Sequence, residues 1–590
     1  MCGICGEVRY SSQPAAVWAV EKMMEKLSPR GPDSGGMFAQ GSIAFGHRRL
    51  KIIDLTEHAQ QPMHDPELGL TLVFNGCIYN YQALREELKG LGYRFFSSGD
   101  SEVILKAFHA WGSECVKRFN GMFAFAIHDR DSGKILLARD RFGIKPLYIA
   151  NLSNGFRFAS SLPALLATGE VDTDIDPVAL HHYMQWHAVV PPPRTLLKGV
   201  KKLPPATIRE IEPDGKYRDT VYWRLTIGPL DDDIGKTHDD WEAELFTTLK
   251  RSVARRSVAD VPVGVLLSGG LDSSLIVGLL AELGQKDLHT FSVGFEAAGG
   301  EHGDEFFYSD LIAQHYQTDH HQIRVPSSRL LDTLPATFSA MSEPMVSYDN
   351  VGFFLLSQEV SKHLKVVQSG QGADEVFGGY HWYPPMQHSD DPLSTYRQHF
   401  FDRSEAEYAE AVSPRFVQGD YSSEFVARYF NNSVAPTGVD KALHIDTNVM
   451  LVDDPVKRVD NMTMAWGLEA RVPFLDHEVV ELAGRMPVEM KLPDGGKHIL
   501  KTLGRKIIPN QVIDRPKGYF PVPALKYIEG PYLEFVKEYL NTDIAKKREI
   551  FQRPYLDKLM RAPRDHITPL RGSKLWQVAM LEMWLQTHGV

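Results

Sequence analysis

The chain contains little cysteine, no long apolar run and no excess of positive charge. Four cysteines among 590 residues are too few for a disulfide scaffold, so we expect a reducing, cytoplasmic location. No apolar run approaches the ~18 residues of a membrane span and no signal peptide opens the chain, so we expect no membrane partner. A net charge of −11 without a sustained Lys/Arg stripe argues against a nucleic-acid partner.

What the chain does contain is a Gly- and Ser-rich turn between an apolar run and a helical pattern. Residues 268–274 read Ser-Gly-Gly-Leu-Asp-Ser-Ser and follow the apolar residues 261–267. Two glycines let the backbone approach a ligand, and a helix N-terminus offers unpaired N–H groups to an anion. The turn therefore predicts a pyrophosphate-like ligand, although it lacks the Lys of a Walker A loop. The alternative is a Gly-rich turn that only packs.

Short apolar segments alternate with helical patterns in the second half, which is typical of a doubly wound parallel sheet. We expect its strands at residues 263–267, 289–295 and 365–368. Ligands bind such sheets beyond the carboxyl ends of the strands. Polar segments stand at these ends, so one nucleotide crevice is predicted. Asp272 and Asp374 fall there and are suited to share a magnesium ion bound to phosphates, whereas either one alone would be read as a helix cap.

Cys2 has three interpretations. With Cys5 it forms a C-x-x-C pair that suits redox chemistry or half of a zinc site, but no second ligand pair follows. Both thiols are also suited to be small buried apolar groups. In the third interpretation Met1 is removed, and Cys2 becomes a nucleophile whose own α-amino group, with a pKa near ~7.7–8.0, accepts the thiol proton.

In chain order, the motifs resemble the glutamine-dependent asparagine synthetase family. The resemblance rests on the Met-Cys-Gly start, the turn at 268–274 and further blocks spread over the whole chain. These blocks include Arg-Gly-Pro-Asp at 30–33, Phe-Asn-Gly-Cys-Ile-Tyr-Asn at 74–80, the segment 369–380 and Arg-Pro-Lys-Gly-Tyr-Phe at 515–520. Within the family, the chain looks closest to the branch called N-acetylglutaminylglutamine amidotransferase.

The resemblance implies two domains of different fold class. Residues 2–222 would form an α+β N-terminal-nucleophile glutaminase domain, that is, a type 2 glutamine amidotransferase domain with α/β/β/α layers. Residues 241–590 would form an α/β doubly wound ATP-pyrophosphatase domain. The segment between them, 223–240, contains Asp231-Asp232-Asp233 and is predicted to be a solvated linker.

The resemblance also assigns a glutamine site to the first domain. It implies that Cys2 attacks the glutamine amide while Asn75 and Gly76 stabilise the oxyanion, as paired donors can. The implied glutamine-binding residues are Arg49, Ile53, Asn75, Gly76 and Asp100. Cys77 stands where the family has a Glu that helps to anchor the substrate amine, which leaves Asp100 to carry that task.

For the second domain the resemblance implies an ATP site with magnesium at Asp272 and Asp374. The implied ATP-binding residues are Leu266, Ser268, Gly269, Gly270, Asp272, Ser273, Val293, Ser369 and Gly370. Lys517 would face the leaving pyrophosphate as a catalytic point charge. Gln371 replaces an acid that lies near the aspartate substrate in asparagine synthetases. A neutral amide is not a base and pairs weakly with a cation, which suggests an acceptor without a free α-amino group.

The resemblance implies an enzyme that uses glutamine, ATP and Mg²⁺ to convert an acceptor carboxylate into an amide through an acyl adenylate. N-acetylglutaminylglutamine is the implied acceptor and aspartate the second choice. A ring-closing synthetase and a non-catalytic nucleotide-binding regulator are the rival interpretations. A homodimer is left open.

Overall fold

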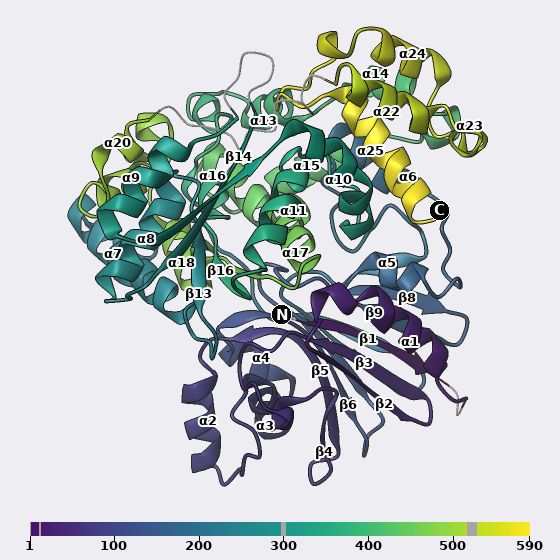
Figure 1. Ribbon diagram of the computed structural model, residues 1–590, viewed down its shortest axis with the longest axis vertical. Helices are drawn as coiled ribbons and strands as arrows, with labels where there is room; N and C mark the ends of the chain where they lie inside the picture. Colours follow the sequence, from purple (N-terminus) through teal and green to yellow (C-terminus); the bar gives the residue numbers. More distant parts are fainter. Residues whose placement is uncertain (1, 11–12, 297–302, 516–524, 526–527) are drawn as a thin grey trace.

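The structure is a computed structural model, described here for residues 2–10, 13–296, 303–515, 525 and 528–590. The first half of the chain forms two stacked six-stranded antiparallel sheets (Figure 1). Their strand orders are β10-β8-β9-β1-β3-β2 and β12-β11-β7-β6-β5-β4. The strands are β1 (Gly3–Arg9), β2 (Ser34–Gln40), β3 (Ile43–Arg49), β4 (Met63–Asp65), β5 (Leu70–Ile78), β6 (Gly121–Asp129), β7 (Ile135–Arg139), β8 (Tyr148–Leu152), β9 (Gly155–Ala159), β10 (Val200–Lys202), β11 (Thr207–Ile211) and β12 (Tyr217–Val221).

The two sheets pack face to face through buried apolar side chains that both contribute, such as Phe45 and Phe158 from one sheet and Val73 and Leu137 from the other. Helices cover the outer faces: α1 (Val17–Lys26) and α5 (Leu162–Leu166) lie on the first sheet, and α3 (Asp100–Trp111) lies on the second with α2 (Tyr81–Gly90) against it. These are the predicted α/β/β/α layers.

The second half is built on a five-stranded parallel sheet with the order β15-β14-β13-β16-β17. The strands are β13 (Val263–Leu266), β14 (His289–Phe295), β15 (Asp319–Val325), β16 (Val366–Gln368) and β17 (Glu469–Arg471). Helix α9 packs on β14 and so does α11, and Figure 1 shows these helices on opposite sides of the sheet. The doubly wound prediction is therefore confirmed, with the three expected strands at their expected positions to within a residue. Two further strands, β15 and β17, were not expected.

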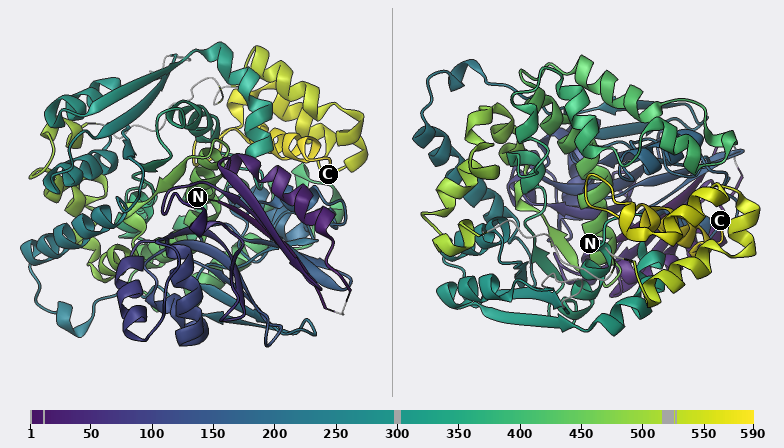
Figure 2. Two further views of the ribbon diagram at one scale, coloured as in Figure 1. Left: turned by 60° about the horizontal axis from the view of Figure 1, so that its bottom comes forward. Right: turned by 90° about the horizontal axis from the view of Figure 1, so that it is seen from above.

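Helices make up most of the remaining chain. In the first half they also include α4 (Cys115–Arg118) and α6 (Pro177–Gln185). In the second half they are α7 (His238–Arg255), α8 (Leu271–Glu282), α9 (Phe306–Tyr316), α10 (Ser327–Ala340), α11 (Asp349–Val360), α12 (Ala373–Phe377), α13 (Pro392–Phe400), α14 (Glu405–Ala411), α15 (Tyr421–Asn432), α16 (Gly438–Ile445), α17 (Lys457–Met464), α18 (His477–Arg485), α19 (His498–Gly504), α20 (Asn510–Ile513), α22 (Pro531–Leu540), α23 (Asp543–Arg548), α24 (Arg553–Arg561) and α25 (Lys574–Thr587). Figure 2 shows the C-terminal helices, in yellow, gathered at one side of the molecule. Among the described residues, no helix combines the length and apolar character that crossing a membrane requires.

The predicted solvated character of residues 223–240 is wrong for Asp233. This side chain is buried and pairs with Lys236 at 2.8 Å and with Arg485 of α18 at 2.7 Å. Two cations pair with the buried Asp233 carboxylate, and one of them, Arg485, belongs to the second half, so this part of the segment packs against the second half.

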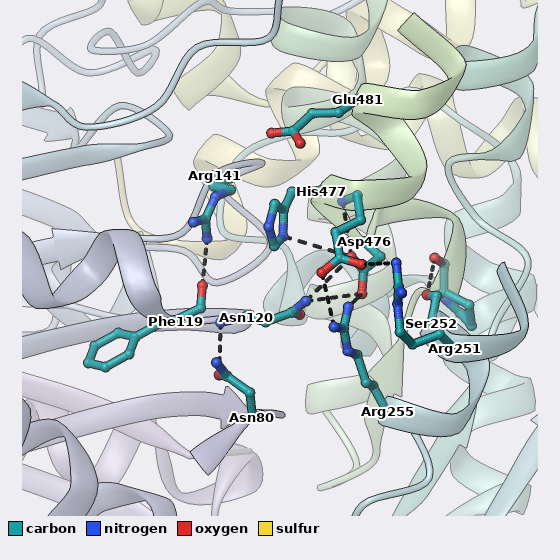
Figure 3. A network of polar contacts seen from close by, with 12 residues as sticks. Asn80, Phe119, Asn120, Arg141, Arg251, Ser252, Arg255, Asp476, His477 and Glu481 are labelled. Carbon is teal, nitrogen blue, oxygen red and sulfur yellow. Dashed lines mark hydrogen bonds and ion pairs between the residues drawn. The ribbon is translucent and has the colours of Figure 1, made fainter. Parts of the chain in front are cut away.

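Polar contacts centred on Asp476 join the two halves (Figure 3). The Asp476 carboxylate accepts hydrogen bonds from Arg256 Nη1 at 2.7 Å and from Asn120 Nδ2 of the first half at 3.5 Å. Burial opposes ionisation, but the Arg256 and Arg255 guanidinium groups hold the pKa of Asp476 well below its usual range. The halves therefore meet through an ionised, buried anchor, which fixes how their sites face one another.

Candidate active sites

A pocket around Cys2 is lined by residues from both halves of the chain. Its lining includes the predicted residues Cys2, Arg49, Ile53, Gly76 and Asp100. It also includes Glu469 and Arg471 from β17, which the sequence did not assign to this site. We call this space the Cys2 pocket.

Asn75 holds Cys2 in place. The Cys2 backbone N–H donates to Asn75 Oδ1 at 3.1 Å, so strand β5 positions the start of β1. The other end of the same amide, Nδ2, is buried without a hydrogen-bond partner among the described residues. A buried donor without an acceptor is costly unless a ligand supplies one, and an oxyanion would do so.

Gly76 is required by a close approach of two strands. A Cβ at this position would lie 2.1 Å from the Met122 carbonyl oxygen of β6, and no side chain fits there. Burial raises the pKa of the Cys2 thiol, so the resting thiol is protonated and needs a base. The α-amino group that Met1 removal would expose is the base that the sequence suggests; Met1 lies outside the described residues.

Arg49 and Asp100 place a cation and a carboxylate in the same pocket. Arg49 Nη1 donates to the Thr56 carbonyl at 2.8 Å and Nη2 to the Asp54 carbonyl. Strand β3 ends at Arg49, and residues 50–54 form no strand. Asp100 begins α3, where its Oδ2 accepts from the Ile78 N–H at 3.0 Å, and burial raises its pKa to about 6.

A cleft of about 510 Å³ opens at the carboxyl ends of the parallel strands. Predicted residues gather in it: Leu266, Ser268, Gly270, Asp272, Ser273, Val293, Ser369, Gly370, Gln371 and Asp374. Gly269 supports the same turn, since its φ is +70° and a Cβ there would lie 2.5 Å from the Ser309 nitrogen. We call this space the strand-end cleft. Lys517 falls outside the described residues.

Lys497 bridges the two proposed magnesium ligands, and the sequence did not single it out. Its Nζ lies 2.6 Å from Asp272 Oδ2 and 2.8 Å from Asp374 Oδ1. Two carboxylate oxygens thus converge on one cation position, and carboxylate oxygens are the ligands that Mg²⁺ prefers. The Gly495-Gly496 pair before Lys497 was the available signal, because glycines next to a lysine often border phosphate sites.

Another wall of the cleft carries Gln371, Asp349, Tyr380 and Arg458. Arg458 is buried, and its Nη1 lies 3.3 Å from Asp349 Oδ2. Tyr380 donates to Glu375 Oε1 at 2.7 Å, and burial followed by the nearby Asp374 charge raises the pKa of Glu375 to about 7. The wall therefore offers a guanidinium that can face a carboxylate, together with a neutral amide at 371.

Together, a cysteine pocket and a nucleotide-sized cleft in one chain define a glutamine-type carbon–nitrogen ligase with two centres. Residues 1–223 match the glutamine amidotransferase domain family and residues 244–586 the asparagine synthase family. The chain belongs to the asparagine synthase family and, like its relatives, is a carbon–nitrogen ligase.

Named relatives extend along the whole chain. Asparagine synthetase [glutamine-hydrolyzing] 1 of Bacillus subtilis is 30% identical, with 99% of this chain and 96% of that protein covered. A putative asparagine synthetase of Mycobacterium tuberculosis is 33% identical over 98% and 97%, and asparagine synthetase B of Escherichia coli is 29% identical over 88% and 82%. These matches confirm the family expected for each half, glutamine amidotransferase for the first and asparagine synthase for the second. They also confirm the expected fold classes.

Proposed function

We propose that the protein hydrolyses glutamine in the Cys2 pocket and uses the ammonia in the strand-end cleft. The Cys2 sulfur would attack the glutamine amide carbon, ammonia would leave, and water would release glutamate from the thioester. Asn75 Nδ2 and the Gly76 N–H would donate to the oxyanion, and Arg49, Ile53 and Asp100 would bind the substrate. The domain limits that we propose are 2–222, 223–240 and 241–590.

In the strand-end cleft, an acceptor carboxylate would attack the α-phosphate of ATP, so that pyrophosphate leaves and an acyl adenylate forms. Ammonia would then displace AMP and leave an amide. Asp272 and Asp374 would hold Mg²⁺, which supplies charge neutralisation to the phosphates. Ser268, Gly270 and Ser273 would contact the phosphates at the start of α8, and Lys497 and Lys517 would balance the charge on the leaving pyrophosphate.

The acceptor that we propose is N-acylated, with N-acetylglutaminylglutamine as the specific candidate. The single observation that supports this choice is Gln371 in the lining of the cleft. A carboxamide at 371 leaves that position without a charge for a free α-ammonium, whereas Arg458 remains for the acceptor carboxylate.

Aspartate is the second candidate acceptor, and Asp349 favours it. This carboxylate lies in the same cleft, beside Arg458, and is an available partner for an α-ammonium. The relatives named asparagine synthetase point the same way. In that case the product would be asparagine.

A direct competition distinguishes the two acceptors. Wild-type protein would receive glutamine, ATP, Mg²⁺ and equal concentrations of N-acetylglutaminylglutamine and aspartate, and mass spectrometry would measure both amides. We expect the dipeptide amide to dominate. If asparagine were the main product, aspartate would replace the dipeptide as the proposed acceptor. Glutamate release measured without any acceptor would test the first centre separately.

A further inference from the structure

Strand β17 belongs to the second half of the chain but forms part of the Cys2 pocket of the first half. Glu469 and Arg471 both line that pocket with Cys2, Cys77 and Asp100. Both side chains are buried, at 1% and 0% exposed. A glutamine bound in the pocket would therefore meet a wall made by the other half of the protein.

Glu469 is held in place as an ionised carboxylate. Arg471 Nε donates to Glu469 Oε1 at 2.5 Å, while Arg471 Nη1 donates to the carbonyls of Arg256 and Val258 at 2.8 and 2.7 Å. Burial opposes ionisation, but nearby positive charges, among them Arg471 and Lys145, lower the pKa of Glu469 to about 2. The carboxylate thus carries its charge at every working pH.

The pocket also contains the Asp100 carboxylate, so two acids line one small space. Burial is the main cause of the raised pKa of Asp100, and the charge of Glu469 adds to it. Burial raises the pKa of the Cys77 thiol, and the charges of the same two carboxylates add to that rise. Arg471 already pairs with Glu469, and Cys77 contributes no charge. An α-ammonium between the two acids would lower the repulsion that remains between them.

We propose that Glu469 binds the α-ammonium of glutamine together with Asp100, so that the second half of the chain completes the glutamine site. Arg49 would bind the α-carboxylate of the substrate, because the negative charges of Glu469 and Asp100 repel a carboxylate from their part of the pocket. Arg471 is a positioning residue, since one of its hydrogen bonds holds the Glu469 carboxylate and two others hold its own guanidinium on the Arg256 and Val258 carbonyls. The proposal rests on the glutaminase centre and does not depend on the acceptor.

The same strand also reaches the strand-end cleft. β17 pairs with β16, and the Ser369 N–H donates to the Arg471 carbonyl at 2.8 Å. Ser369 lines the strand-end cleft, so one peptide hydrogen bond separates a cleft residue from a residue of the Cys2 pocket.

The test uses two substrates that differ only in the α-amino group: glutamine and glutaramate, which lacks it. Amide hydrolysis would be measured for full-length wild type and Glu469→Gln. We expect kcat/KM for glutamine to fall at least tenfold, mainly through KM, while kcat/KM for glutaramate changes less than threefold. If Glu469 had a purely structural role, the change would lower kcat/KM for both substrates by the same factor, and that result would overturn the proposal.

Two further variants keep the test decisive. Glu478→Gln removes a carboxylate that pairs with Arg251 outside the Cys2 pocket and should leave the ratio of the two substrates unchanged. If Glu469→Gln fails to fold, Glu469→Asp retains the charge one methylene further back and should lower only the glutamine kcat/KM. If wild type released no glutamate from glutamine, the glutaminase centre would be refuted, whereas a substrate ratio that stays unaltered in the Glu469 variants would refute only the role of Glu469.

Discussion

The Arg30 guanidinium donates two hydrogen bonds, of 2.9 and 3.1 Å, to the Asp460 carboxylate across the boundary between the glutaminase half and the synthetase half. Arg30 Nε also donates to the Cys2 carbonyl at 3.3 Å, and Lys145 lies 3.4 Å from the same carboxylate. One acid of α17 therefore anchors the residue that bears the proposed nucleophile.

Asp460→Asn should destabilise the protein. Arg30 and Lys145 would remain buried without their shared counter-charge, and breaking a buried ion pair typically costs about 3–5 kcal/mol. Thermal unfolding should show a lower Tm than wild type. A matched change at the exposed ion pair of Lys216, Asp214→Asn, should leave Tm within error; equal shifts in both variants would contradict the anchoring role.

Cys2→Ala should abolish glutamine-dependent amidation while amidation from added ammonium chloride persists. The reason is that Cys2 lies in one centre and the nucleotide cleft is the other. Amide formation would be followed with each nitrogen source in turn. Parallel loss of both activities would mean that the two centres do not divide the work.

Asp272→Asn and Asp374→Asn should each lower acceptor-dependent pyrophosphate release at least a hundredfold. Each change removes one charge from the shared cation position, where metal stabilisation of phosphate is worth several kcal/mol. Pyrophosphate release and acceptor-free glutamate release would be assayed on the same preparation, and the second should persist. Normal pyrophosphate release would exclude that aspartate from the metal site.

Gln371→Glu should weaken the use of N-acetylglutaminylglutamine. The new carboxylate would oppose the acceptor carboxylate by roughly 1–4 kcal/mol for charges about 4 Å apart, depending on the local dielectric. KM for the acceptor would be compared with that of wild type and of Gln371→Asn, which stays neutral. A variant that uses the dipeptide better than wild type would refute the charge argument.

The KM for glutamine should rise as the pH falls below about 6, because the buried Asp100 carboxyl, whose pKa is raised to about 6, then takes up a proton. Protonation removes one of the two charges that would bind the substrate ammonium, whereas Glu469 stays ionised down to about 2. Steady-state glutaminase assays between pH 5 and 8 would show this. Glutaramate, without an ammonium, should not show the same rise.

The sequence could predict most of the strand-end cleft because its residues follow apolar strands, and parallel strands end at one edge. It could not predict β15 or β17 as strands. β15 reads Asp-His-His-Gln-Ile-Arg-Val and β17 is only Glu-Ala-Arg, so neither carries the apolar run by which buried strands are found. Both become strands through pairing with β14 and β16.

The sequence could predict only those lining residues of the Cys2 pocket that the first half of the chain contributes. Cys2, Arg49, Asn75 and Asp100 came from motif order, whereas Glu469 depends on how two halves dock, and no local pattern encodes docking. Lys497 was missed for a similar reason, since Asp272 and Asp374 are distant in sequence. The apolar run at 575–585 does not indicate by itself how much of it is buried; in the C-terminal helix α25 these residues are buried on every side because α10 and α22 pack around it.

The position of β17 limits how far the two halves can be treated as interchangeable parts. Two residues that the chain order assigns to the synthetase, Glu469 and Arg471, complete the wall of the glutaminase. Production of residues 2–222 without the second half would leave the nucleophile without Glu469 and that wall open. Exchange of the glutaminase half between relatives would need a matching strand in the recipient, so the two halves must vary together.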